Sequence, residues 1–285
     1  MASDVVVITD SVANLSPEMV TRYGIEIVPI VLLIGGKLYR DGVDISPTEA
    51  YKMFLKDPDK FNTSPSSPGH YLEAYREASK RAKNIFCVTL SSKLSTGYQM
   101  ALVAKEEAGK ELPGIRIEVM DSQNVTASEG FIALAAARAA GAGKSLAEVV
   151  KSAEEVKEKV TFFAFLDTLR YVYRTGRIPK ITSQIGAMLN VRPVLTISDG
   201  AIHFKGVVKS REQGMSRLIE TLRKKAGKGP VHVAVMHAFA PEEAQRLKER
   251  ISSEFVCSEL FITEFSPVMG YATGTGTLGL AFYKD

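Results

Sequence analysis

The sequence predicts an α/β protein of two domains, and three observations lead to this prediction. Short apolar runs alternate with segments that have helical caps and helical periodicity, an order typical of a mainly parallel sheet covered by helices. The chain has 285 residues, of which 45% are hydrophobic, enough for two cores of ordinary size. A domain boundary is predicted near residue 160, because Gly141-Ala142-Gly143 breaks the helical pattern and the sequence pattern changes from Phe162 on. We therefore expect domains at 1–160 and 161–285.

The first domain reads as strands that alternate with helices. Ser46-Pro47 and Ser67-Pro68 have the form of helix starts, because Ser caps the helix and Pro takes its first position. Helices are expected after both. The other strands and helices follow in chain order: a strand at 5–8, an apolar stretch at 25–34, a strand at 85–90, a helix at 95–109, a strand at 115–119, a small-residue helix at 128–140 and a charged helix at 145–159.

The second domain is predicted to hold a smaller, mixed sheet. A tight turn at Asp199-Gly200 predicts a hairpin. The expected elements are a strand at 162–165, a short apolar helix at 181–189, the hairpin strands at 193–197 and 201–204, a helix at 211–225, a strand at 231–237, a helix at 241–252, and strands at 256–263 and 278–283. A ligand is expected between the domains, since α/β sheets bind ligands at their strand ends.

Composition and charge argue against several classes of function. The formal net charge is only +4 and the basic residues are scattered, so nucleic acid is not an expected partner. No apolar run approaches ~20 residues, so no membrane span is expected, and transient contact with a membrane surface stays open. No secretory signal is visible, which favours a cytoplasmic protein. Four scattered histidines and no CxxC pair predict no metal site.

Three hydroxyl-rich loops precede helices in the first domain: Thr9-Asp10-Ser11, 63–67 and 91–96. Helix N-termini carry unpaired N–H groups, and hydroxyls beside them add donors, so the loops are suited to a carboxylate or phosphate. For any one loop taken alone, helix capping is the favoured explanation. Parallel strands end at one edge, which favours a shared anion site. Arg177, in a basic glycine-containing turn, either faces this site or lies on the surface.

Two other functions have weaker support. A P-loop and a dinucleotide fingerprint after the first strand are absent, and the glycine spacing at 274–279 leaves no room for the helix that a nucleotide site needs. Ser95 could act as a nucleophile on an acyl ester, but it lacks a GxSxG elbow. We therefore expect no catalytic residue, and keep the serine hydrolase as an alternative.

Several motifs together resemble the DegV family, bacterial proteins that bind a fatty acid between two α/β domains. The resemblance runs nearly end to end. The motifs that carry it are ITDSVANLS at 8–16, DGVDIS at 41–46, TSPSS at 63–67, LSSKLSTGYQ at 90–99, MDSQNVTASEG at 120–130, LDTLRYVYRTGRI at 166–178, MLNVRPVLTISDG at 188–200 and TGTGTLGLAFY at 273–283.

The resemblance implies a non-catalytic carrier that presents the carboxylate of a free C16–C18 fatty acid to a separate fatty acid kinase subunit. No other cofactor is implied. The family pattern places the carboxylate on Thr63, Ser95 and Arg177. Further contacts are expected from Thr96, Gly97 and Thr273. The expected wall for the acyl chain consists of Ile185, Met188, Leu189 and Leu195, although an ordinary core position is the favoured interpretation of any one of them.

Three positions depart from the family pattern. The loop reads Ser95-Thr96-Gly97 where the family has Ser-Gly-Thr, Ala272 replaces a family histidine with Thr275 in place of a proline, and Lys209 aligns loosely with an arginine. These changes raise a third hypothesis, in which the protein carries or senses another apolar acid such as an isoprenoid.

Overall fold

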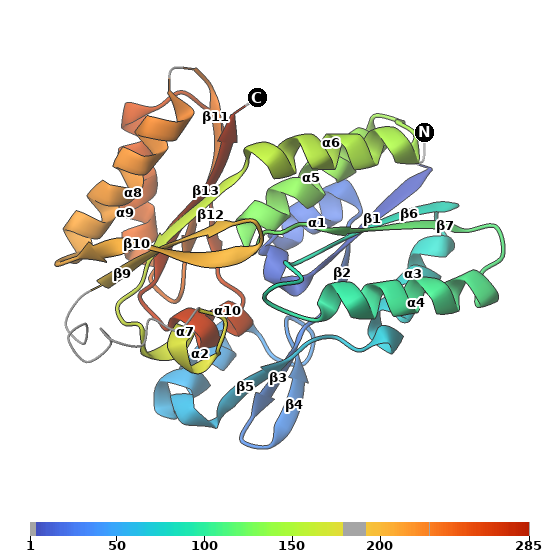
Figure 1. Ribbon diagram of the computed structural model, residues 1–285, viewed down its shortest axis with the longest axis horizontal. Coiled ribbons are helices and arrows are strands. Elements are labelled where there is room, and N and C mark those ends of the chain that lie inside the picture. The colour runs from blue at the N-terminus through green and yellow to red at the C-terminus, as the bar shows by residue number, and fades with distance from the viewer. Residues whose placement is uncertain (1–3, 179–191, 228, 285) are drawn as a thin grey trace.

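The computed structural model describes residues 4–178, 192–227 and 229–284, and it contains the predicted parallel sheet (Figure 1). The strands of this sheet lie in the order β2-β1-β6-β7, and every neighbouring pair is parallel. Their bounds are β1 Val5–Asp10, β2 Glu26–Val28, β6 Asn84–Thr89 and β7 Arg116–Asp121. The α/β class is confirmed.

Helices cover both faces of the parallel sheet. One face packs on α3 and α4, and the other on α5 and α6, with α1 beside α5. Ser67 accepts a hydrogen bond from His70 N at the start of α3, which agrees with the predicted cap. The bounds are α1 Pro17–Tyr23, α3 Pro68–Ser79, α4 Gly97–Glu111, α5 Ala127–Gly141 and α6 Leu146–Lys159.

The second sheet is mixed, as predicted, but it is larger than the first. Its six strands lie in the order β10-β9-β8-β13-β11-β12, and only β11 and β12 pair in parallel. The prediction that the mixed sheet is the smaller one was wrong, because β8 and both hairpin strands join the same sheet as β11, β12 and β13. The bounds are β8 Thr161–Phe165, β9 Arg192–Ser198, β10 Ala201–Val208, β11 Val231–His237, β12 Cys257–Glu264 and β13 Leu278–Lys284.

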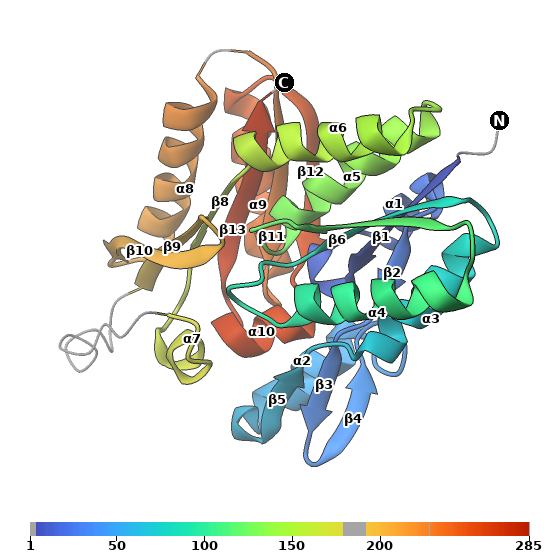
Figure 2. The same cartoon turned by 45° about the vertical axis from the view of Figure 1, so that its right-hand side comes forward.

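The two sheets share the layer of α5 and α6, while α8 (Arg211–Ala226) and α9 (Pro241–Glu254) cover the outer face of the mixed sheet (Figures 1 and 2). α5 is buried on nearly every side, which suits its alanine-rich sequence. Its core contacts include β1 and β13. The strands of the two sheets come from either side of residue 160, and the domain boundary there stays a prediction.

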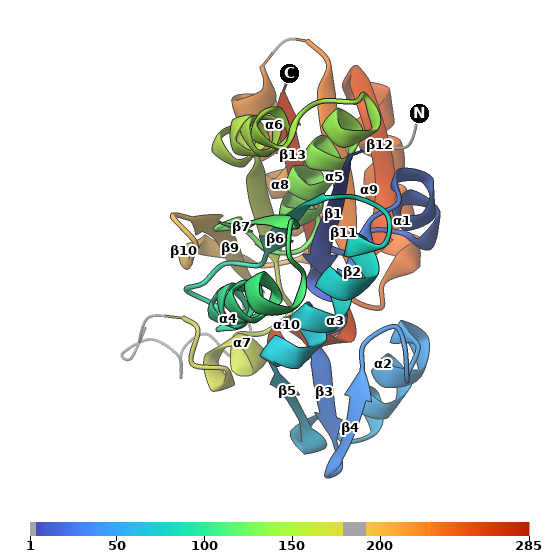
Figure 3. The same cartoon turned by 90° about the vertical axis from the view of Figure 1, so that its right-hand side faces the viewer.

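A third, antiparallel sheet of three short strands was not predicted. It has the order β4-β3-β5 and projects with α2 from the main body (Figures 2 and 3). The apolar stretch at 25–34 divides at Pro29, which has no N–H for a strand ladder, so β2 and β3 enter different sheets. The bounds are β3 Val31–Ile34, β4 Lys37–Arg40, β5 Phe61–Ser64 and α2 Pro47–Lys56.

Two short helices, α7 (Arg170–Arg174) and α10 (Pro267–Thr273), pack on each other between the mixed sheet and the small sheet (Figures 1 and 2). The short helix predicted at 181–189 lies outside the described residues. Within the described ranges, no helix has the length and apolarity that crossing a membrane requires. The same ranges contain no group of His, Cys, Asp or Glu side chains placed to hold a metal ion.

Candidate ligand-binding site

A cavity of about 940 Å³, counting the space open to solvent at its mouth, lies between the two halves of the chain. Both halves contribute to the lining. From the first half come Val12, Ile30, Thr63, Ser64, Pro65, Leu90, Leu94, Ser95 and Val125. From the second half come Phe162, Ala164, Leu166, Val172, Thr175, Arg177, Leu195, Ile197, Ile202, Val268, Met269, Tyr271, Ala272 and Thr273.

The mixed sheet supplies much of the apolar wall. Alternate residues of a strand point to opposite faces, so Phe162 and Ala164 face the cavity while Phe163 and Phe165 pack in the core beneath α8. β9 continues this face: Leu195, which pairs with Ala164, also lines the cavity. Leu195 is thus placed where the sequence predicted a wall residue. The other predicted wall residues, Ile185, Met188 and Leu189, lie outside the described residues.

The polar lining comes from four segments that touch one another. Thr63 and Ser64 lie on β5, Ser95 lies in the 91–96 loop, and Arg177 follows α7. α10, which ends at Thr273, contacts both β5 and α7. The structure therefore brings together four of the six residues predicted to bind a carboxylate. Their binding role stays a prediction.

Ser95 is held by the start of α4. Its Oγ accepts a hydrogen bond from Gly97 N at 3.3 Å, which leaves the hydroxyl hydrogen free to donate elsewhere. Thr96 is exposed and makes no side-chain cap at the start of α4. Gly97 is buried, and a Cβ at this position would make a tight contact of 3.1 Å with Tyr71 Oη. Neither Thr96 nor Gly97 lines the cavity, although both are next to Ser95.

Arg177 joins the two halves at the cavity. Its Nε donates to Leu94 O at 3.2 Å, and its Nη1 donates to Thr175 O at 2.9 Å. The guanidinium is exposed and positively charged. It therefore stands beside the Ser95 loop as a cation that an anionic head group could reach. Of the two roles left open for Arg177, the structure favours the cavity.

Thr273 has a different hydrogen-bonding state from Ser95. Its Oγ1 donates to Met269 O at 2.9 Å, so its single hydroxyl hydrogen is already engaged. Ala272 also lines the cavity, so an apolar methyl group stands where the resemblance implied a histidine. Lys209 is exposed and is not among the lining residues.

Two buried acids lie behind the cavity. Asp10 accepts hydrogen bonds from Val12 N and Leu90 N, which belong to cavity-lining residues, at 3.0 and 2.9 Å. Burial raises the pKa of Asp10 to about 6, against the lowering effect of these bonds. Burial, and then the nearby Asp10 charge, raise the pKa of Glu129 well above its usual range. Glu129 accepts a hydrogen bond from Thr9 Oγ1. The Thr9-Asp10-Ser11 segment therefore supports the residues that line the cavity.

Sequence reasoning missed most of the lining. Ser64 and Thr175 neighbour predicted residues, and their hydroxyls were a usable signal. The alternation of Phe162, Ala164 and Leu166 was a second signal, because it predicts one face of a strand. Val12, Ile30 and Val125 had no such signal, since each looks like any core residue until the chain is folded.

The comparisons with known proteins agree with this arrangement. Residues 4–285 match the family described as "Uncharacterised protein, DegV family". A DegV domain-containing protein of Streptomyces coelicolor is 33% identical over 282 residues, which cover 98% of each chain. Protein DegV of Bacillus subtilis is 28% identical over 281 residues, or 98% of this chain and 99% of that one.

Solved structures share the whole fold. A DegV family protein from Thermus thermophilus, described as binding fatty acid, has a TM-score of 0.89 and 27% identity, with 99% of this chain and 100% of that chain covered. DegV of Bacillus subtilis, described as a fatty acid binding protein, has a TM-score of 0.88 and 28% identity over 99% of this chain and 100% of that chain. With the family match running almost from end to end, the chain belongs to the DegV family.

Proposed function

We propose that this protein binds one long-chain fatty acid in the cavity between its two halves. The observation that carries the proposal is the division of the lining into an extended apolar wall and a connected set of hydroxyls with one arginine. Such a lining matches a molecule with a long apolar tail and a single anionic head. Related proteins of the same fold are described with fatty acids, among them a DegV family protein of Ruminococcus gnavus with vaccenic acid.

The energetic balance supports this ligand class. Burying a 16-carbon tail at ~0.8 kcal/mol per CH₂ supplies on the order of 12 kcal/mol. Desolvating a carboxylate without partners would cancel much of this gain. The Ser95 hydroxyl, the Thr63 hydroxyl and the Arg177 guanidinium provide partners at the cavity. We infer that the tail supplies most of the affinity and that these three side chains fix the position of the head.

Mass spectrometry of an organic extract tests the proposal. The protein is purified from a bacterial host and denatured before extraction, and a stoichiometric C16–C18 fatty acid is expected. The Thr63→Ala/Ser95→Ala variant should lose it. Thr96→Ala is a matched control, because this exposed threonine lies in the same loop but does not line the cavity. An empty extract, with no uptake of added fatty acid, would contradict the proposal.

We further propose that the bound carboxylate is presented to a separate kinase subunit, which transfers a phosphoryl group from ATP to form an acyl phosphate. ATP is a cytoplasmic metabolite, so this step places the protein in the cytoplasm. The loaded protein, a bacterial fatty acid kinase subunit and ATP should together yield a product that hydroxylamine traps as a hydroxamate. If a kinase that is active on another DegV protein forms no hydroxamate with this one, the proposal that the carboxylate is presented to a kinase is contradicted.

The same protein sample also tests the remaining hypotheses. A serine hydrolase needs a base beside its nucleophile, but the four histidines make their contacts elsewhere, and Ser95 Oγ accepts a hydrogen bond from Gly97 N. Turnover of short nitrophenyl esters that Ser95→Ala abolishes would support a hydrolase instead. Exchange against isoprenoid and other apolar acids would identify a different ligand, if one of them displaces the fatty acid completely.

A further inference from the structure

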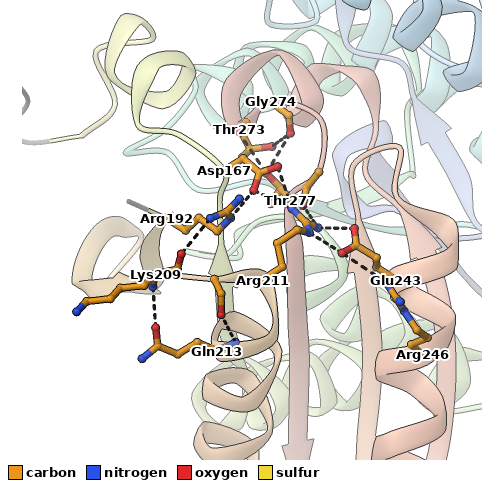
Figure 4. Close-up of polar contacts among 12 residues, drawn as sticks. Asp167, Arg192, Lys209, Arg211, Gln213, Glu243, Arg246, Thr273, Gly274 and Thr277 are labelled. Carbon is orange, nitrogen blue, oxygen red and sulfur yellow. Dashed lines mark hydrogen bonds and ion pairs between the residues drawn. The ribbon is translucent and has the colours of Figure 1, made fainter. Parts of the chain in front are cut away.

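Arg211, in the first turn of α8, uses all of its N–H donors within the described part of the chain (Figure 4). Its Nη1 donates to Asp167 Oδ1 and Oδ2 at 2.8 and 2.9 Å. Its Nη2 donates to Gly276 O at 2.7 Å and to Glu243 Oε2 at 2.6 Å, and its Nε donates to Glu243 Oε1. One guanidinium thus joins the residue after Leu166, the first turn of α9 and the 274–277 loop.

The 274–277 loop fits closely around this guanidinium. Gly276 has φ +84°, and a Cβ there would lie 2.3 Å from Asp167 Oδ2 and 3.2 Å from Arg211 Nη1. On the inner side, Thr277 Oγ1 donates to Gly274 O at 3.0 Å and to Thr273 O at 3.3 Å. The position of the loop is therefore fixed from two sides, and the residue before it, Thr273, lines the cavity.

Asp167 connects the same guanidinium to the other polar segment of the cavity. It directly follows Leu166, a lining residue, and precedes the helix and turn that carry Thr175 and Arg177. Its Oδ1 also accepts from Arg192 Nε at 2.8 Å (Figure 4). The Asp167 and Arg211 side chains are 38% and 24% exposed, so the pair is screened less than a surface ion pair. The two parallel hydrogen bonds of this guanidinium run from Nε and Nη2 to Glu243, and such a bidentate pair fixes geometry as well as charge.

We propose that Arg211 is a positioning residue for the head-group side of the cavity. Acting through Asp167 and the Gly276 carbonyl, it sets the distance between Thr273 and the segment that carries Thr175 and Arg177. It does not line the cavity itself. This inference rests on the proposed function, and it assigns to the network a role in selecting a carboxylate head over a neutral one.

The test compares two ligands with the same tail. Delipidated wild type and Arg211→Lys are titrated with palmitate and with 1-hexadecanol. Lysine keeps the charge but cannot donate to two carboxylates and a carbonyl in one plane. We expect palmitate binding to weaken at least tenfold and hexadecanol binding to change by less than twofold. Arg217→Lys, on the same helix and paired with Glu220 at the surface, should bind both ligands as the wild type does.

The outcomes separate this inference from the proposed function. A wild type that binds no palmitate removes the function itself. A wild type that binds palmitate, with Arg211→Lys binding it equally well or losing both ligands equally, overturns the positioning role alone. If Arg211→Lys does not fold, Asp167→Asn decides by the same titrations, since it removes the charge on the other side of the pair. Unchanged selectivity in Asp167→Asn also overturns the inference.

Discussion

At the scale of single residues, the described lining of the cavity combines neutral donors with one exposed cation, Arg177. Ser95 is oriented by the amide of Gly97, whereas Thr273 already donates its hydroxyl hydrogen to Met269 O in the first turn of α10. Two hydroxyls of similar appearance in the sequence thus have different capacities in the structure. Ser95 can donate to a carboxylate without any rearrangement, and Thr273 would first have to break its bond to Met269 O.

Asp10 makes the stability of the fold depend on pH. Its pKa rises from 3.8 to about 6 because the carboxyl is buried, so its stabilising contribution is complete below about pH 4 and is lost as the pH rises to 6. The shift corresponds to on the order of 3 kcal/mol. In Asp10→Asn this titration is absent. The free energy of unfolding of the wild type minus that of Asp10→Asn should therefore fall between pH 4 and 6.

Denaturant unfolding at several pH values measures this difference. The difference is needed because other groups titrate in the same range. Burial lowers the pKa of His237 to about 4, so the contribution of His237 to the stability of the fold rises with pH and has to be subtracted. Asp44→Asn is the control: the hydrogen bonds from Arg40 lower the pKa of this exposed carboxyl to about 2, so its difference curve should be flat from pH 4 to 6. A flat curve for Asp10→Asn as well would show that Asp10 titrates normally.

At the scale of elements, α5 is limited by the two sheets between which it lies. Gly130 of α5 is buried, and a Cβ there would lie 2.4 Å from the backbone oxygen of Ala13. Gly109 of α4 has open space and an exposed position. Gly130→Ala should therefore destabilise the protein by roughly 1–3 kcal/mol through overpacking. Gly109→Ala should stabilise it by roughly 0.5–1 kcal/mol through helix propensity.

Urea unfolding with an unchanged m-value decides between these outcomes. The two substitutions are chemically identical and both lie inside helices, so each is the control for the other. If both variants were stabilised, Ala13 would have to move away from α5 at no cost, and the close contact between this helix and the loop after β1 would not limit the packing.

The elements that sequence patterns predicted well are those with a clear signal in their own residues, such as a continuous apolar run or a Ser-Pro helix start. Strand 231–237 was predicted with its observed bounds, and Ser46 caps α2 as predicted. The small sheet was missed because β4 is polar and short, and because the division at Pro29 depends on which sheet each half joins. The cavity wall was also missed, because the sequence of a strand does not show which layer will face each of its two sides.

At the scale of the whole molecule, the cavity lies within the contact between the two halves. The core cluster around α5 includes cavity residues from both, such as Val12, Leu90, Phe162 and Leu195. A ligand in the cavity would therefore add contacts that span the chain from the turn after its first strand to its last helix. Binding and global stability should then be linked, since a ligand that binds only the folded state stabilises that state.

This linkage gives the last prediction. For the delipidated wild type, the midpoint of thermal unfolding should rise with palmitate concentration, by an amount equivalent to about 2.7 kcal/mol at a hundredfold excess over Kd. Leu195→Trp should abolish the rise, because the larger side chain fills the cavity. Val207→Trp, in the same hairpin but 43% exposed and lining a different groove, should keep it. A rise that persists in Leu195→Trp would mean that palmitate binds elsewhere.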